Sequence, residues 1–111
     1  MSDETRLQSY VDTWAVAVED ALMSHADVKE VAVIGIPDEK WGELVTALVV
    51  TTPGSTLSED EVIAWTKQKL AGYKCPKKVE FRTELARTAT GKLQKFKLRA
   101  PFWEGRQRQV N

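Results

Sequence analysis

Cysteine and histidine each occur only once in this sequence of 111 residues, as Cys75 and His25. A single cysteine excludes a disulfide framework within the chain and any metal site built from several cysteines. No apolar run approaches the roughly 20 residues that span a membrane. The acidic start, Met1 to Glu4, also differs from the basic and apolar regions of a secretory signal peptide. We therefore expect a cytoplasmic protein of one domain, with no membrane span and no metal site.

The net charge is zero, with sixteen basic and sixteen acidic residues, but the charges are unevenly distributed. Residues 1–73 contain 5 basic and 13 acidic residues, whereas residues 74–99 contain 9 basic and 2 acidic residues. Such a basic run is either an ordinary solvated surface or a surface that meets phosphates, nucleic acid or an acidic partner. Few aromatic residues accompany the basic ones, and no nucleic-acid-binding motif is present, so we expect no nucleic-acid partner.

The spacing of apolar residues predicts an α+β fold with the element order α-β-β-α-β-loop-α. The expected elements are a helix over 7–22, strands over 31–34 and 44–50, a helix over 58–70, a strand over 79–82, a loop over 87–91, and a short helix from about 93 that Pro101 interrupts. The first helix is predicted from the helical spacing of five apolar residues, Leu7, Val11, Trp14, Val18 and Leu22. We expect about three strands in a small, mainly antiparallel sheet covered by helices on one side.

The helix over 58–70 carries its own start and stop signals. Ser58 and Glu61 have the spacing of a capping box, in which each side chain accepts a hydrogen bond from the other residue's backbone N–H. Gly72 is expected to end this region.

The segment from Thr88 to Lys92 has the composition of a ligand loop. It contains Thr88, Thr90, Gly91 and Lys92. Glycine lets the backbone approach a ligand closely, and lysine is a point charge suited to phosphate and to developing negative charge. The segment is not a P-loop, because Ala86 stands where that motif requires glycine. On this signal alone, an exposed loop lysine is the simpler interpretation.

Four motifs in order give this loop a context. They are VAVIGIPDEKWGE at 31–43, LSEDE at 57–61, YKCPKKV at 73–79 and RTATGKLQK at 87–95. This series resembles the C-terminal lid domain of the adenylate-forming acyl-CoA synthetases, or fatty-acid–CoA ligases, over about residues 16–99. The segment FWEGR at 102–106 is also similar to the end of such ligases.

The resemblance implies a two-step reaction. A large N-terminal domain binds ATP, magnesium and a carboxylic acid and forms an acyl-adenylate, after which the lid rotates and presents another face for thioester formation with CoA. It implies that Lys92 is the adenylation lysine and that Thr88, Thr90 and Gly91 form its nucleotide loop. ATP, Mg and CoA are then co-substrates of the complete enzyme, and this chain alone holds none of them tightly.

The resemblance also implies a CoA site. By motif, its residues are Trp41, Tyr73, Lys74 and Lys77. Aromatic rings can stack on adenine, and lysines can pair with phosphates. Lys95 and Lys97, by contrast, are expected to be exposed charges on the following helix.

The start of the chain departs from the family pattern. Residues 9–13 stand in place of a glycine-rich loop, and Ala17 replaces the first glutamate of a Glu-x-Glu pair, which leaves Glu19. We therefore divide the chain into a divergent helical segment over 1–17 and a lid-like domain over 18–111.

Two functions remain open. In the first, the chain is the lid of an acyl-CoA ligase and is inactive without its large domain. In the second, it is a stand-alone, non-catalytic module whose N-terminal helix mediates homodimerisation or binds another protein.

Overall fold

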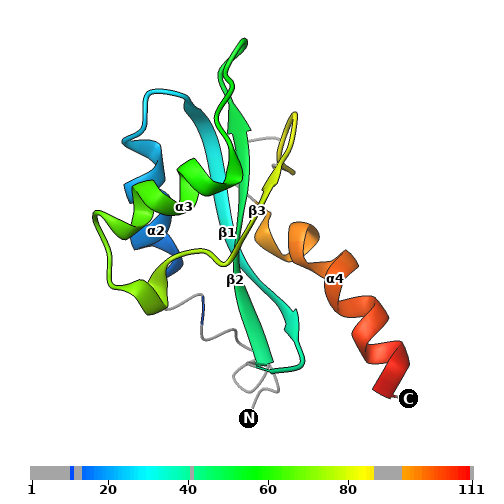
Figure 1. The fold of residues 1–111 in the computed structure, drawn as a ribbon. Helices are drawn as coiled ribbons and strands as arrows, with labels where there is room; N and C mark the ends of the chain where they lie inside the picture. The colour runs from blue at the N-terminus through cyan, green and yellow to red at the C-terminus, as the bar shows by residue number, and fades with distance from the viewer. Residues whose placement is uncertain (1–10, 12–13, 41, 87–93, 111) are drawn as a thin grey trace.

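A computed structural model describes residues 11, 14–40, 42–86 and 94–110, with the backbone alone for Tyr73 and for 104–110. Its elements are α2 (Ala15–Met23), β1 (Val28–Asp38), β2 (Gly42–Thr51), α3 (Glu59–Lys67), the 3-10 helix η2 (Gly72–Lys74), β3 (Lys78–Phe81) and α4 (Lys95–Val110). Figure 1 shows α2 and α3 on one side of the sheet and α4 on the other. The α+β class and the predicted order of helices and strands are confirmed, whereas the predicted loop over 87–91 lies outside the described residues.

The three strands form one mixed sheet in the order β1-β2-β3. β1 and β2 are antiparallel, from the pair Val28 and Thr51 to the pair Asp38 and Gly42. β3 is short and runs parallel to β2, with Thr46 opposite Lys78. Parallel neighbours need a crossover connection, and α3 supplies it on the way from β2 to β3. The longer pairing is therefore antiparallel, as expected, and the third strand is parallel.

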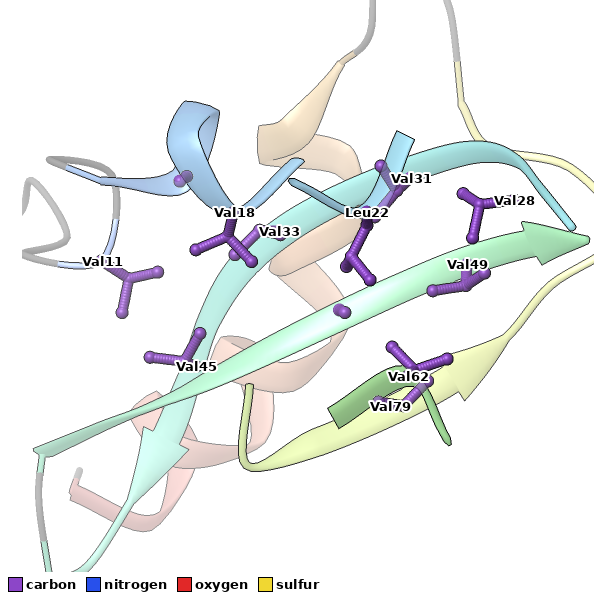
Figure 2. Close-up of a cluster of buried hydrophobic side chains, with 12 residues drawn as sticks. Val11, Val18, Leu22, Val28, Val31, Val33, Val45, Val49, Val62 and Val79 are labelled. Atoms are coloured by element: carbon purple, nitrogen blue, oxygen red, sulfur yellow. The ribbon is translucent and has the colours of Figure 1, made fainter. Parts of the chain in front are cut away.

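Both faces of the sheet are buried, so the expectation of cover on one side is wrong. The first core cluster lies between the sheet and α2 and α3, and Figure 2 shows the valines and Leu22 that fill it. The second core cluster, under α4, contains Ala32, Ile34, Leu48 and Leu98. Alternate residues of a strand point to opposite faces, and the central residues of β1 and β2 are apolar on both. Such a sheet requires a helix on each side.

The first helix begins later than the sequence indicates. Trp14 has φ −126° and ψ 8°, which are not helical values, and α2 starts at Ala15. A single helix over 7–22 is therefore wrong, although residues 7–10, 12 and 13 lie outside the described residues. Val11 is nevertheless fully buried in the first core cluster, where Figure 2 shows it close to Val45. The apolar stripe correctly indicated burial but not a continuous helix.

The last helix continues through Pro101, so the predicted interruption is wrong. Proline in a helix removes one backbone hydrogen bond and crowds the preceding turn. Packing on both sides opposes this cost: Leu98 and Phe102 join the second core cluster, and the Trp103 Nε1–H donates to the Gly35 carbonyl at 2.9 Å. None of the helices described here has the length and apolar character that crossing a membrane requires.

Candidate functional site

The predicted site residues are unequally covered by the structure. Trp41, Thr88, Thr90, Gly91 and Lys92 lie outside the described residues, and the Tyr73 side chain is not described. Lys74 is half-buried and Lys77 is exposed. The geometry of the site therefore comes from the elements that flank the predicted residues.

The turn before Gly42 joins β1 to β2. Asp38, the last residue of β1, pairs with Gly42, and the Lys40 N–H donates to Asp38 Oδ2 at 3.1 Å. Gly42 has φ 82°, a left-handed conformation that favours glycine over residues with a side chain. Asp38 and Gly42, which flank the predicted Trp41, thus lie at the tip of the β1–β2 hairpin.

Two buried residues, Cys75 and Pro76, hold the Tyr73–Lys77 segment in place. Cys75 is 1% exposed, with its Sγ 3.5 Å from the Ala71 carbonyl oxygen, and Pro76 is also buried. The Lys77 N–H then donates to the Val45 carbonyl at 2.8 Å, which attaches the segment to β2. Val45 is three residues from Gly42, or about 10 Å along a strand. The segment and the hairpin tip therefore lie at the same end of β2.

The segment carrying Lys92 is attached elsewhere. The Gln94 N–H donates to the Ala86 carbonyl at 3.0 Å, so residues 87–93 leave and re-enter the described structure at neighbouring points. Leu85 before the segment and Leu98 after it are both buried in the second core cluster. The residues that flank the segment are therefore attached on the face of the sheet that α4 covers.

The residue after Gln94 makes an ion pair that the sequence did not reveal. Lys95 Nζ lies 2.6 Å from Glu19 Oε2, and the two side chains are 28% and 15% exposed. The expectation that Lys95 is an exposed charge is wrong, whereas Lys97 is exposed as expected. The same Glu19 oxygen accepts the Val33 N–H at 2.8 Å. Glu19 therefore joins α2, the outer edge of β1 and the start of α4.

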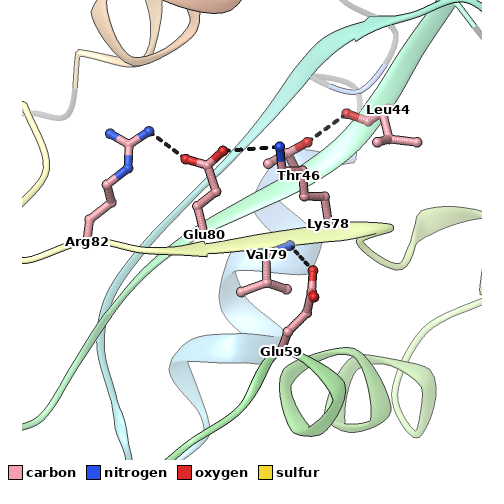
Figure 3. A network of polar contacts seen from close by, with 7 residues as sticks. All are labelled: Leu44, Thr46, Glu59, Lys78, Val79, Glu80 and Arg82. Atoms are coloured by element: carbon pink, nitrogen blue, oxygen red, sulfur yellow. Dashed lines mark hydrogen bonds and ion pairs between the residues drawn. The ribbon is translucent and has the colours of Figure 1, made fainter.

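The opposite edge of the sheet has a related contact. Glu59 of α3 accepts the Val79 N–H at 2.8 Å through Oε2, as Figure 3 shows. Glu19 and Glu59 are more than a dozen residues from their partners, and no local spacing rule links them. Sequence reasoning missed both contacts for this reason.

Part of the basic region is neutralised by Glu80 of β3, which pairs with one cation in the strand and one just after it. Figure 3 shows Glu80 between Lys78 and Arg82, at 3.4 Å from Lys78 Nζ and 2.9 Å from Arg82 Nη2. The hydrogen bond from Arg82, with help from Lys78, lowers the pKa of Glu80 below the usual 4.5, although partial burial opposes this shift. Among the described residues, no group of three or more histidine, cysteine, aspartate or glutamate side chains is placed to hold a metal ion.

The family model described as the AMP-binding enzyme C-terminal domain matches residues 17–92, a range that contains every predicted site residue. The 4-hydroxybutyrate–CoA ligase 2 of Metallosphaera sedula is 52% identical over 85 residues, which are 77% of this chain and 15% of that relative. Feruloyl-CoA synthase of an Amycolatopsis species is 46% identical over 85 residues, which are 77% of this chain and 17% of that relative.

Solved structures agree with these relatives. ATP-bound MatB from Rhodopseudomonas palustris has a TM-score of 0.76 and 39% identity, covering 79% of this chain and 18% of that one. A Brucella canis acyl-CoA synthetase has a TM-score of 0.78 and 35% identity, covering 83% of this chain and 18% of that one. The chain thus spans only about one sixth of the length of the curated relatives it matches. It belongs to the AMP-binding enzyme C-terminal domain family and is a C-terminal domain of the adenylate-forming acyl-CoA ligases.

Proposed function

We propose that this domain supplies Lys92 to the adenylation step of an ATP-dependent acyl-CoA ligase and contributes Trp41, Tyr73, Lys74 and Lys77 to its CoA site. The observation that carries the proposal is the family match over 17–92, which contains all five residues. A large N-terminal domain, in the same or a separate chain, binds ATP with magnesium and the carboxylic acid. That acid is fatty or otherwise apolar, and its pocket lies on the large domain.

In this proposal, the Lys92 ammonium acts between the substrate carboxylate and the α-phosphate of ATP. One positive charge there reduces the repulsion between two anions and stabilises the charge that develops during displacement of pyrophosphate. Thr88, Thr90 and Gly91 shape the approach of the segment to the nucleotide. A group on a connecting segment suits a role that is needed in one half-reaction and withdrawn in the other.

The CoA residues serve the second half-reaction. Trp41 and Tyr73 offer aromatic faces to the adenine of CoA, and Lys74 and Lys77 offer cations to its phosphates. The anchored hairpin tip and the attachment of Lys77 to Val45 support a shared site at this end of β2. The Lys92 segment is anchored instead on the α4 side through Ala86 and Gln94. Two separate attachment points fit a domain that presents two surfaces in turn.

The proposal is tested in a hybrid ligase, in which the large N-terminal domain of the M. sedula relative is joined to the full 111-residue chain. Lys92→Ala should reduce adenylation roughly 10²–10³-fold, because a positioned charge is lost from a water-poor site. Thioester formation from purified acyl-adenylate should change much less. Lys92→Arg should not restore adenylation fully, since the planar guanidinium cannot occupy the same point.

The two half-reactions are measured as pyrophosphate release and as CoA-thioester formation, with 4-hydroxybutyrate as the acid. Lys97→Ala is the matched control, because Lys97 is an exposed lysine on α4. Equal losses in both half-reactions for Lys92→Ala would indicate a docking or folding defect. No loss in either would show that Lys92 is only an exposed lysine.

A further inference from the structure

We propose that the ion pair between Glu19 and Lys95 positions Lys92 for adenylation, by fixing the start of α4 where the Lys92 segment ends. Both are positioning residues, because they act on the reaction through Lys92. The inference rests on the proposed role of Lys92. It adds that adenylation also requires an intact contact between α2 and α4.

A second contact to the same carboxylate oxygen supports the ion pair. Glu19 projects from α2, and a single oxygen, Oε2, accepts both the Lys95 ammonium at 2.6 Å and the Val33 N–H at 2.8 Å. Val33 lies in β1, at the edge of the sheet, with its backbone paired to Ala47 of β2. With Glu19 85% covered, the carboxylate is held by the sheet and in turn holds Lys95. Charge-assisted hydrogen bonds of this kind are shorter and stronger than neutral ones.

The contact also sits where it can control the Lys92 segment. Lys95 follows Gln94, whose N–H closes that segment onto the Ala86 carbonyl. Gln94 in turn accepts the N–H groups of Lys97 and Leu98, which starts α4. Lys95 therefore ties this junction to the edge of the sheet by a side chain, while Leu98 ties it to the core.

Glu59 at the other edge of the sheet shows that the pairing of Glu19 with Lys95 is more than a way to cover an edge strand. Glu59 makes the same kind of bond to the Val79 N–H at the other edge, also at 2.8 Å. Among the described residues, no cation pairs with Glu59. Covering a strand edge therefore does not require a lysine in this fold. The recruitment of Lys95 to Glu19 is an additional feature, and it is located next to the proposed catalytic segment.

The first measurement needs no activity and uses the full chain. Amide hydrogen exchange at Gln94 is followed in the wild type, in the ion-pair variants Lys95→Ala and Glu19→Gln, and in the control variants Lys97→Ala and Glu59→Gln. In Lys95→Ala and Glu19→Gln, we expect the protection of the Gln94 amide against exchange to fall about tenfold, because the loss of a charge-assisted hydrogen bond has an effect of about this size. Glutamine at position 19 can still accept the Val33 N–H, so this variant tests the ion pair and not the strand edge. Lys97→Ala and Glu59→Gln should leave Gln94 unchanged.

The second measurement uses the hybrid ligase. Lys95→Ala and Glu19→Gln should each slow pyrophosphate release about 10- to 100-fold, because a small misplacement of a catalytic group has effects of this size. Thioester formation from purified acyl-adenylate should change less than about threefold, on the same reasoning that only Lys92 is displaced. Lys95→Arg keeps the charge and should restore most of the adenylation rate. The double variant should be no slower than either single variant, since both remove one interaction.

The outcomes distinguish this inference from the proposed function. If Lys92→Ala blocks adenylation while Lys95→Ala and Glu19→Gln do not, the positioning role is wrong and the proposed function stands. If Lys92→Ala has no effect, the proposed function is wrong, and the exchange data still show whether the ion pair fixes Gln94. Unchanged exchange at Gln94 in both ion-pair variants would overturn the inference. Equal losses in both half-reactions, matched by Glu59→Gln, would reduce the pair to a general stabilising contact and would also overturn it.

Discussion

Two glutamates of this domain show how a side chain from a helix can complete an edge of a sheet. Glu19 and Glu59 accept the N–H groups of Val33 and Val79, each at 2.8 Å. Unpaired N–H groups on edge strands otherwise offer a template for pairing with another chain. A carboxylate at each edge satisfies one such donor and adds a negative charge that disfavours edge-to-edge association.

A third glutamate gives a prediction about pH. The pKa of Glu80 is lowered in the folded chain, chiefly by the hydrogen bond from Arg82. A carboxyl with a lowered folded pKa adds stability above its unfolded pKa and loses it as the pH falls through the folded pKa. Glu80→Gln should therefore lower the free energy of unfolding at neutral pH by about 0.2–1 kcal/mol, the range of partly exposed ion pairs.

Urea unfolding at a series of pH values measures this effect. The difference between wild type and Glu80→Gln should shrink as the pH falls below the usual carboxyl value of 4.5. Glu84→Gln, at an exposed carboxyl nearby, serves as the control. A difference that stays constant down to low pH would show that packing, not charge, is responsible.

At the scale of the element, α3 is the clearest case of a helix specified by its own sequence. The Glu61 N–H donates to Ser58 Oγ at 3.2 Å, and the Ser58 N–H donates to Glu61 Oε1 at 2.8 Å. This reciprocal pair is the predicted capping box, and it is confirmed. Three acidic residues in the first turn add a favourable interaction with the helix dipole.

Removing this cap should have a measurable effect on stability. Ser58→Ala deletes the acceptor for the Glu61 N–H and should lower the free energy of unfolding by about 1 kcal/mol. The change is read from chemical denaturation of the full chain. Thr56→Ala, at an exposed position two residues earlier, should stay within about 0.5 kcal/mol of wild type. A Ser58→Ala variant as stable as Thr56→Ala would contradict the role of the cap.

α4 shows the opposite situation, in which packing overrides a local signal. Pro101 is an unfavourable residue within a helix, yet the helix runs from Lys95 to Val110. Leu98 and Phe102 are held in the second core cluster, and Trp103 bonds to Gly35 of β1. The helix persists because the sheet provides a surface that residues on both sides of Pro101 can cover.

At the scale of the whole molecule, the domain has one sheet and two cores. α2 and α3 close one face, and α4 closes the other. This arrangement attaches the hairpin tip and the Tyr73–Lys77 segment at one place and the Lys92 segment at another. Under the proposed function, these two attachment points place the CoA residues and the adenylation lysine on different parts of the domain, one for each half-reaction.

The chain by itself should not make an acyl-adenylate. The chain spans about one sixth of the length of its curated relatives. A pocket that encloses both ATP and an acid needs more lining residues than a chain of 111 residues supplies. Purified chain with ATP, magnesium and either 4-hydroxybutyrate or a fatty acid should release no pyrophosphate above the buffer control. The hybrid ligase, assayed in parallel, shows that the reagents support the reaction. Substantial pyrophosphate release by the chain alone would refute the proposed dependence on a large domain.

Residues close together in the sequence determine many of the secondary-structure elements of this protein. The cap at Ser58, the apolar runs that form β1 and β2, and the element order all follow from residues close together in the chain. The ordered motifs also identified the family, because a series of four short patterns rarely occurs by chance. The candidate site residues came from the same motifs, and their roles remain predictions.

Contacts between distant residues were settled by the tertiary structure. The parallel placement of β3, the cover on the second face and the late start of α2 all depend on which surfaces meet. The ion pair between Glu19 and Lys95 is the sharpest example, because 76 residues separate two charges that individually resemble solvated ones. Local spacing encodes propensity and periodicity, whereas burial and pairing depend on the three-dimensional neighbours that only the folded sheet brings together.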